Sequence, residues 1–167
     1  MTRAARQTVW QVRTCGLPIG IRNGGDGLCP IAKALGTQVA ETREHATVTS
    51  PTAALVWRHV LAAWERASGV AFTTPRDMQR AVLLGLTALP LGLLAEPIVL
   101  LSAVTLHCIV MHRHTVSKKL SQPTHPDYRV SQSAATVYEA VRVSFAACLH
   151  GERERCRLLE RQMRRAG

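Results

Sequence analysis

Apolar residues recur with helical spacing through most of the chain. Between positions 50 and 69 the i, i+3, i+4, i+7 spacing is filled by Trp57, Val60, Leu61 and Trp64. Ser50 is a favourable N-cap, Pro51 suits the first helical position, and Gly69 suits a helix end. The pattern predicts an amphipathic helix over residues 50–69.

The same spacing returns near the C-terminus and predicts a long basic amphipathic helix over residues 131–167. Its apolar face, which we expect to form a helix interface, contains Val137, Val141, Phe145, Leu149, Leu159 and Met163. A helix of about 35 residues is about 52 Å long, more than the rest of so small a chain can cover. We therefore expect part of this face to bind a second copy or another protein. Glu152 interrupts the otherwise heptad-like spacing.

Residues 81–111 are the most hydrophobic part of the chain, and Glu96 is their only formally charged residue. A run of more than about 18 apolar residues with so few charges is typical of a membrane segment. The alternative is a buried helical pair in a soluble bundle. Leucines cover the whole circumference of a helix here, which favours lipid because a small chain has few neighbours to surround it. The expected membrane region contains Leu83, Leu86, Leu89, Leu93, Glu96, Pro97, Leu100 and Val104.

The start signals divide this block into two helices. Thr74 and Asp77 resemble a capping box and predict a helix start near Pro75. Pro97 follows Glu96 and predicts a second start. Residues 75–114 are therefore expected to form an apolar helical hairpin.

The distribution of basic residues favours a hairpin over a single crossing. Ten Lys and Arg residues precede Ala81 and eleven follow Met111. A hairpin keeps both basic flanks on the cytoplasmic side, as the positive-inside tendency requires. We therefore expect both termini to be cytoplasmic and Glu96 to lie at the opposite interface. Residues 115–130 are expected to be a polar linker.

The N-terminal segment, residues 1–49, has mixed character. Residues 7–13 alternate as expected for a short strand, and residues 22–27 form a turn cluster rich in Gly and Asn. Residues 31–35 predict about two turns of helix, closed by Gly36. The expected fold is therefore mainly α, with a small mixed α/β segment at the N-terminus.

Composition indicates a basic protein whose cysteines are reduced. The net charge is +10, which favours acidic partners. The five cysteines are scattered and odd in number, which indicates reduced thiols rather than a disulfide framework. No signal-like apolar core is expected within residues 1–14.

The chain carries few candidates for chemistry. Cys29 at a helix start could be a nucleophile, but packing as a small apolar residue is the favoured interpretation. Cys108 and His112 have i, i+4 spacing, yet no zinc-binding pattern accompanies them. No phosphate loop, dinucleotide fingerprint or nucleophile elbow occurs in the sequence. We expect a non-catalytic protein without cofactor or metal.

The C-terminal arginines are the strongest candidates for binding. Their spacing of i, i+4, i+7 and i+8 places on one helical face Arg157, Arg161, Arg164 and Arg165. Such a face can bind the phosphates of anionic lipid or of nucleic acid. We expect a small membrane-associated helical protein that acts through anionic-lipid or partner binding. The alternative is a soluble, cytoplasmic basic helical bundle that binds nucleic acid or a protein.

Overall fold

The computed structural model describes residues 6–8, 11, 26–69, 95–120 and 128–166. Within these residues the protein is mainly helical, as the sequence predicts, and contains no strand. The elements are a short helix α2, a π-helical turn η2 and three long helices. In chain order they are α2 (Pro30–Ala34), η2 (His45–Thr49), α3 (Pro51–Ser68), α5 (Ala95–Leu120) and α6 (Val130–Ala166).

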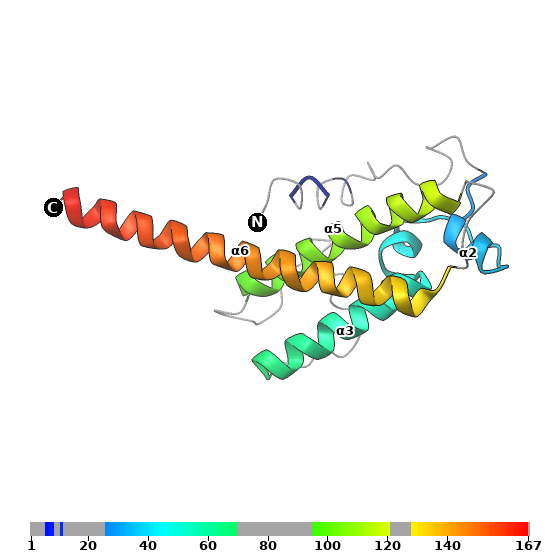
Figure 1. Cartoon of the computed structure of the whole chain (residues 1–167), viewed down its shortest axis with the longest axis horizontal. Coiled ribbons are helices and arrows are strands. Elements are labelled where there is room, and N and C mark those ends of the chain that lie inside the picture. The colour runs from blue at the N-terminus through cyan, green and yellow to red at the C-terminus, as the bar shows by residue number, and fades with distance from the viewer. Residues whose placement is uncertain (1–5, 9–10, 12–25, 70–94, 121–127, 167) are drawn as a thin grey trace.

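The first half of α6 packs against both α3 and α5, and this arrangement makes the bundle (Figure 1). Helix α6 runs antiparallel to α5 and in the same direction as α3. The main core is formed where the three helices and η2 meet. Its buried members include Val48, Val56, Trp57, Val60, Leu101, Val104, Ile109, Ala134, Val137 and Val141.

Helix α3 matches the prediction from the sequence. Ser50 Oγ accepts a hydrogen bond from the backbone N–H of Ala53 at 3.4 Å, and Pro51 occupies the first helical position. Gly69 ends the helix with a φ of +70°, a conformation that a side chain would strain. Its N–H donates to the carbonyl oxygen of Glu65 at 2.8 Å.

Helix α2 also lies where the sequence places it. Cys29 is its N-cap, and Gly36 turns the chain with a φ of +75°. Two hydrogen bonds then hold the returning chain beside the start of the helix: Cys29 N–H to Val39 O and Glu41 N–H to Gly27 O, both at 2.8 Å. Residues 27–41 thus form one compact loop.

The strand expected over residues 7–13 is wrong where the structure describes it. Residues 7, 8 and 11 are helical. Thr8 is 5% exposed, and its hydroxyl hydrogen-bonds Nδ1 of His107 on α5 at 2.8 Å. A strand needs a partner strand for its backbone groups, and no described residue offers one, so packing on α5 overrides the local alternation.

Helix α5 is longer than predicted. It begins at Ala95 and continues to Leu120, so residues 115–120 of the expected polar linker are helical. Val116 and Leu120 continue its apolar face and pack against Cys29 and Ile31 of the α2 loop. That contact, which links residues far apart in sequence, explains the extra turns. The first half of the predicted hairpin, residues 75–94, lies outside the described residues.

One described helix meets the length and hydropathy expected of a membrane span. This helix is Ile98–Leu120 of α5, and half of its most apolar window is buried inside the protein. Val104 is 3% exposed within the main core, and Leu100 packs against that core. In this fold the middle of α5 therefore serves as a core helix.

Candidate interaction surface

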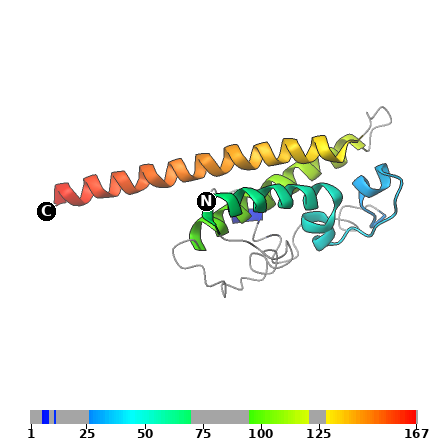
Figure 2. The same ribbon diagram turned by 90° about the horizontal axis from the view of Figure 1, so that it is seen from below.

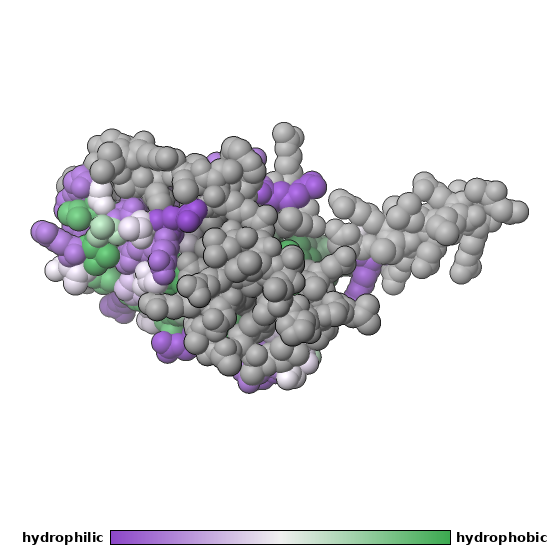
Figure 3. All heavy atoms as spheres, turned by 180° about the vertical axis from the view of Figure 1, so that it is seen from behind, coloured by the Kyte–Doolittle hydropathy of each residue, from purple (hydrophilic) through white to green (hydrophobic). Residues whose placement is uncertain are grey.

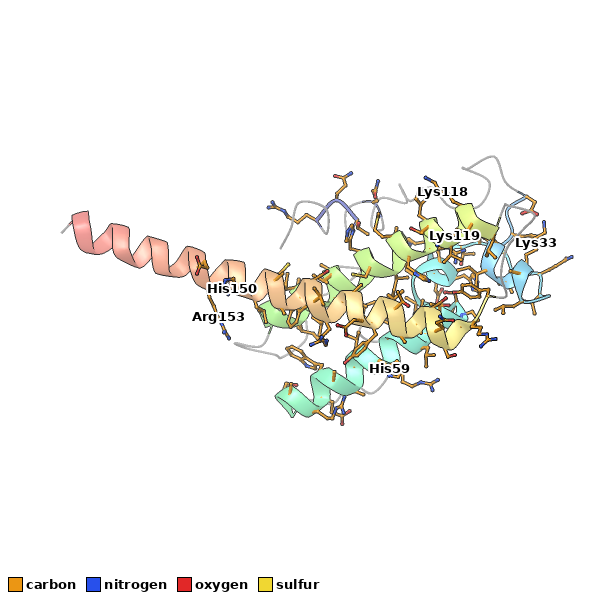
Figure 4. The ribbon with its side chains drawn as sticks, viewed as in Figure 1. Lys33, His59, Lys118, Lys119, His150 and Arg153 are labelled. Carbon is orange, nitrogen blue, oxygen red and sulfur yellow. The ribbon has the colours of Figure 1, made fainter. Side chains whose placement is uncertain are left out.

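The C-terminal half of α6 extends beyond the bundle as a single helix (Figures 1 and 2). We call residues 149–166 the α6 arm. At 1.5 Å per residue the arm is about 27 Å long. Phe145 and Cys148, just before the arm, pack against the main core. His150 and Arg153 lie on the free part of the helix (Figure 4), and both are exposed.

The structure divides the predicted helix interface into two parts. Val137 and Val141 are 2% and 1% exposed, and Phe145 is partly buried, all within the chain's own core. Leu149 is half-buried at the edge of the bundle. Leu159 and Met163 lie farther along the arm, where the helical backbone is described. The first part of the stripe is therefore covered by α3 and α5, and only the arm remains as a candidate for a partner.

The arm is strongly basic. It contains six arginines and three glutamates, a net charge of +3. The four arginines that the sequence singles out, Arg157, Arg161, Arg164 and Arg165, all lie within it. By contrast, Arg142 near the bundle is paired with Glu139 at 2.7 Å, and its hydrogen bonds hold the pKa of that carboxyl below its usual value. The net positive charge of α6 is thus concentrated in the arm.

The expected membrane residues are only partly placed. Leu100 and Val104 lie on α5 at the main core, and Glu96 and Pro97 lie in its first turn. The remaining members, Leu83, Leu86, Leu89 and Leu93, lie outside the described residues. Leu100 and Val104 therefore contact protein in this structure.

A buried polar cluster joins the α2 loop to α5, and the sequence analysis did not find it. Arg113 forms an ion pair with Glu41, and the two side chains are 7% and 9% exposed. Arg113 Nη2 also donates to Cys29 Sγ at 3.2 Å. One signal was present: Ile109, Arg113 and Val116 step by four and three, so the arginine lies within an apolar stripe of α5. Its partner Glu41 is 72 residues away, so the sequence around Arg113 does not indicate the ion pair.

Cys29 has a structural role in this cluster. It is fully buried, and Sγ accepts a hydrogen bond from the N–H of Ala32 at 3.3 Å. This geometry agrees with the favoured interpretation of Cys29 as a packed residue at a helix start. Cys108 and His112 belong to no group of three metal-ligating side chains among the residues that the structure describes.

The surface near α2 is mixed in polarity. On the face seen in Figure 3, apolar and polar side chains alternate at that end of the molecule. Leu35 and Val39 are 39% and 36% exposed there. Lys33 also lies at this end (Figure 4) and pairs with Asp26 at 3.0 Å. These side chains are too scattered to define a second binding surface.

Comparison of the chain with protein-family models, curated proteins and solved structures gives no match.

Proposed function

We propose that the protein is a non-catalytic, membrane-associated helical protein whose α6 arm binds anionic phospholipid on the cytoplasmic side. The observation that carries this proposal is the arm itself: a basic helix that leaves the bundle and has no described neighbour alongside it. Each cationic side chain near an anionic bilayer contributes about 1 kcal/mol of attraction. Several arginines on one helix supply enough attraction for reversible binding.

The two sides of the arm favour a lipid surface over nucleic acid. Arg157, Arg161 and Arg164 share one side by their spacing, whereas Leu159 and Met163 belong to the apolar stripe. A basic side next to an apolar side is the pattern of helices that lie in a membrane interface. The arm has no aromatic residue on which bases could stack.

The burial of α5 supports association at the membrane surface. Leu101 and Val104 are 8% and 3% exposed in the bundle, and Arg113 pairs with Glu41. Insertion of α5 would remove Leu101 and Val104 from the core of the bundle. It would also break the buried ion pair, and that loss alone costs several kcal/mol. Insertion of residues 75–114 as a hairpin is the deeper alternative. Both arrangements keep the two termini in the cytoplasm.

Vesicle flotation tests the proposal. Full-length protein is mixed with neutral phosphatidylcholine vesicles or with vesicles that also contain phosphatidylglycerol. We expect flotation with the anionic vesicles alone, and weaker binding as salt rises because exposed charges are screened. Equal flotation with both vesicles, or none with either, would count against the proposal. Duplex DNA and single-stranded RNA are added as competitors to test the nucleic-acid alternative. That alternative requires the protein to bind the nucleic acid more tightly than the vesicles and therefore to stop floating.

Alkaline carbonate washing of cell membranes measures the depth of association. Surface binding predicts that the protein is released into the supernatant. Retention in the pellet would support the inserted hairpin instead.

A further inference from the structure

The face of α6 that packs on the bundle continues along the α6 arm. Tyr138 and Phe145 pack against the main core and lie seven residues apart. Seven residues are nearly two full turns, so positions at this interval stay on one side of a helix. The interval continues to positions 152, 159 and 166. A second set, positions 149, 156 and 163, lies three residues before each of these on the same side of the helix, as the two seam positions of a heptad do. Along the arm this stripe consists of Leu149, Glu152, Cys156, Leu159, Met163 and Ala166.

No described helix runs alongside the arm (Figures 1 and 2). Helix α3 ends at Ser68 and α5 begins at Ala95, both before the arm leaves the bundle (Figures 1 and 2). A single helix in water gains little stability on its own, because helices in proteins are stabilised mainly by packing of an apolar face. An apolar stripe of about 27 Å, interrupted by Glu152, therefore calls for a partner helix.

We infer that the partner is a second copy of this chain, and that the two α6 arms pair in opposite directions. The stripe lies on the side of α6 that α3 and α5 cover nearer the bundle. In a parallel pair the second copy would have to place its own α6, α3 and α5 in the space already filled by these helices. In an antiparallel pair each bundle lies beyond the tip of the other arm, so the two bundles do not collide.

The charges on the arm favour the same direction. A parallel pair would place Glu152 opposite Glu152 of the second copy, and like charges on a seam repel. An antiparallel pair with Cys156 opposite Leu159 of the second copy places Glu152 opposite Met163. In this register Arg153 flanks Glu160 of the second copy, and the symmetry gives two such pairs. This is the charge complementarity that identifies a second copy as the occupant.

The pairing leaves the basic side of the arm free. Heptad spacing places outside the seam Arg157, Arg161, Arg164 and Arg165. In the dimer the apolar side of the arm faces the second copy instead of lipid, so the two basic sides would bind an anionic surface through charge alone, and bivalently. The pairing itself needs no lipid, so it does not rest on the proposed function, and it is measured without vesicles.

Sedimentation velocity of the full chain at tens of micromolar tests the pairing. We expect a dimer for the wild type and more than about a tenfold weaker dimer for Leu159→Asp, because the change buries a charge on the seam. Leu158→Asp is the matched control: it introduces the same charge one residue away, off the seam, and should leave the dimer intact. A monomeric wild type, or equal effects of the two substitutions, would overturn the inference.

Charge reversal tests the direction. Glu160→Arg should weaken the dimer about two- to tenfold, because two exposed ion pairs become repulsive. Adding Arg153→Glu should restore the affinity if the arms are antiparallel. A parallel pair instead brings Arg155 beside Glu160 of the second copy, so rescue by Arg155→Glu and not by Arg153→Glu would overturn the antiparallel arrangement. The two double variants have the same net charge.

Discussion

Arg113 on α5 holds Glu41 in an ion pair that is almost wholly buried, although the two residues are 72 positions apart. The same guanidinium group donates to Cys29 Sγ at 3.2 Å. Glu41 and Cys29 stand near the two ends of the loop that carries α2, and backbone hydrogen bonds connect those ends. One side chain of α5 therefore fastens the whole loop to the bundle.

This relationship predicts an asymmetric response to substitution. Arg113→Met leaves the Glu41 carboxylate buried without its cation, so we expect a loss of about 3 kcal/mol in the free energy of unfolding. The double variant Arg113→Met/Glu41→Leu replaces the pair with apolar side chains and should recover most of that loss. Urea denaturation followed by circular dichroism measures both. A single variant that loses less than about 1 kcal/mol would show that the pair is not buried as described.

The two buried tryptophans of α3 should respond differently to the same substitution. Trp57 Nε1–H donates to the carbonyl oxygen of Thr47 in η2 at 2.9 Å, whereas Trp64 Nε1 is buried with no hydrogen-bond partner among the described residues. Trp57→Phe removes a hydrogen bond between two elements and should cost about 1–3 kcal/mol. Trp64→Phe also reduces the side-chain volume, but it removes a polar group that has no described hydrogen bond. Its loss in the free energy of unfolding should therefore be smaller. Equal losses in thermal and urea unfolding would contradict this contrast.

Burial of His45 predicts a loss of stability in mild acid. His45 is 9% exposed, and desolvation lowers its pKa below the ordinary value of 6.5. Below pH 6.5 the unfolded chain therefore binds a proton at this position more readily than the folded chain. The free energy of unfolding should rise with pH up to about 6.5 and then level off.

Substitution isolates the contribution of His45. His45→Gln should make the dependence between pH 5.5 and 7.5 shallower, as measured by urea denaturation at several pH values. His114 is exposed, so His114→Gln is the matched control and should keep the wild-type slope. If the His45 variant also kept that slope, the burial of the imidazole would not be responsible.

Local signals were sufficient to predict α3 and α2. Helix α3 begins at the N-cap Ser50 followed by Pro51, and it ends at Gly69. All of these capping contacts lie within the helix or one residue beyond it. The same holds for Cys29 and Gly36 at α2. Such capping effects depend on neighbouring residues alone, so the sequence specifies them directly.

Tertiary contacts decided what the sequence analysis missed. The π-helical turn η2 is stabilised by Ser50 N–H to His45 O at 2.9 Å and by the bond from Trp57 to Thr47. The helical conformation around Thr8 coincides with a hydrogen bond to His107, 99 residues later. Periodicity cannot specify such pairs, because it describes one segment of the chain and contains no information about which other segment packs against it. The candidate binding residues of the arm, by contrast, were chosen from spacing and charge along one helix, and their role stays a prediction.

In the proposed function the α6 arm binds the membrane through its arginines, and a vesicle-binding isotherm measures their contribution. The measurement compares wild-type protein with a variant in which glutamine replaces Arg157, Arg161, Arg164 and Arg165, using vesicles that contain about one-third anionic lipid. A control variant removes the same charge from exposed positions elsewhere by glutamine substitution of Arg58, Arg66, Lys119 and Arg129.

At about 1 kcal/mol per cation, loss of the arm arginines should weaken partitioning by at least about a hundredfold. The control variant should weaken it by less than about tenfold, because its residues lie outside the arm. Equal losses in the two variants would contradict binding through the α6 arm and would leave only a general attraction between a basic protein and an anionic surface.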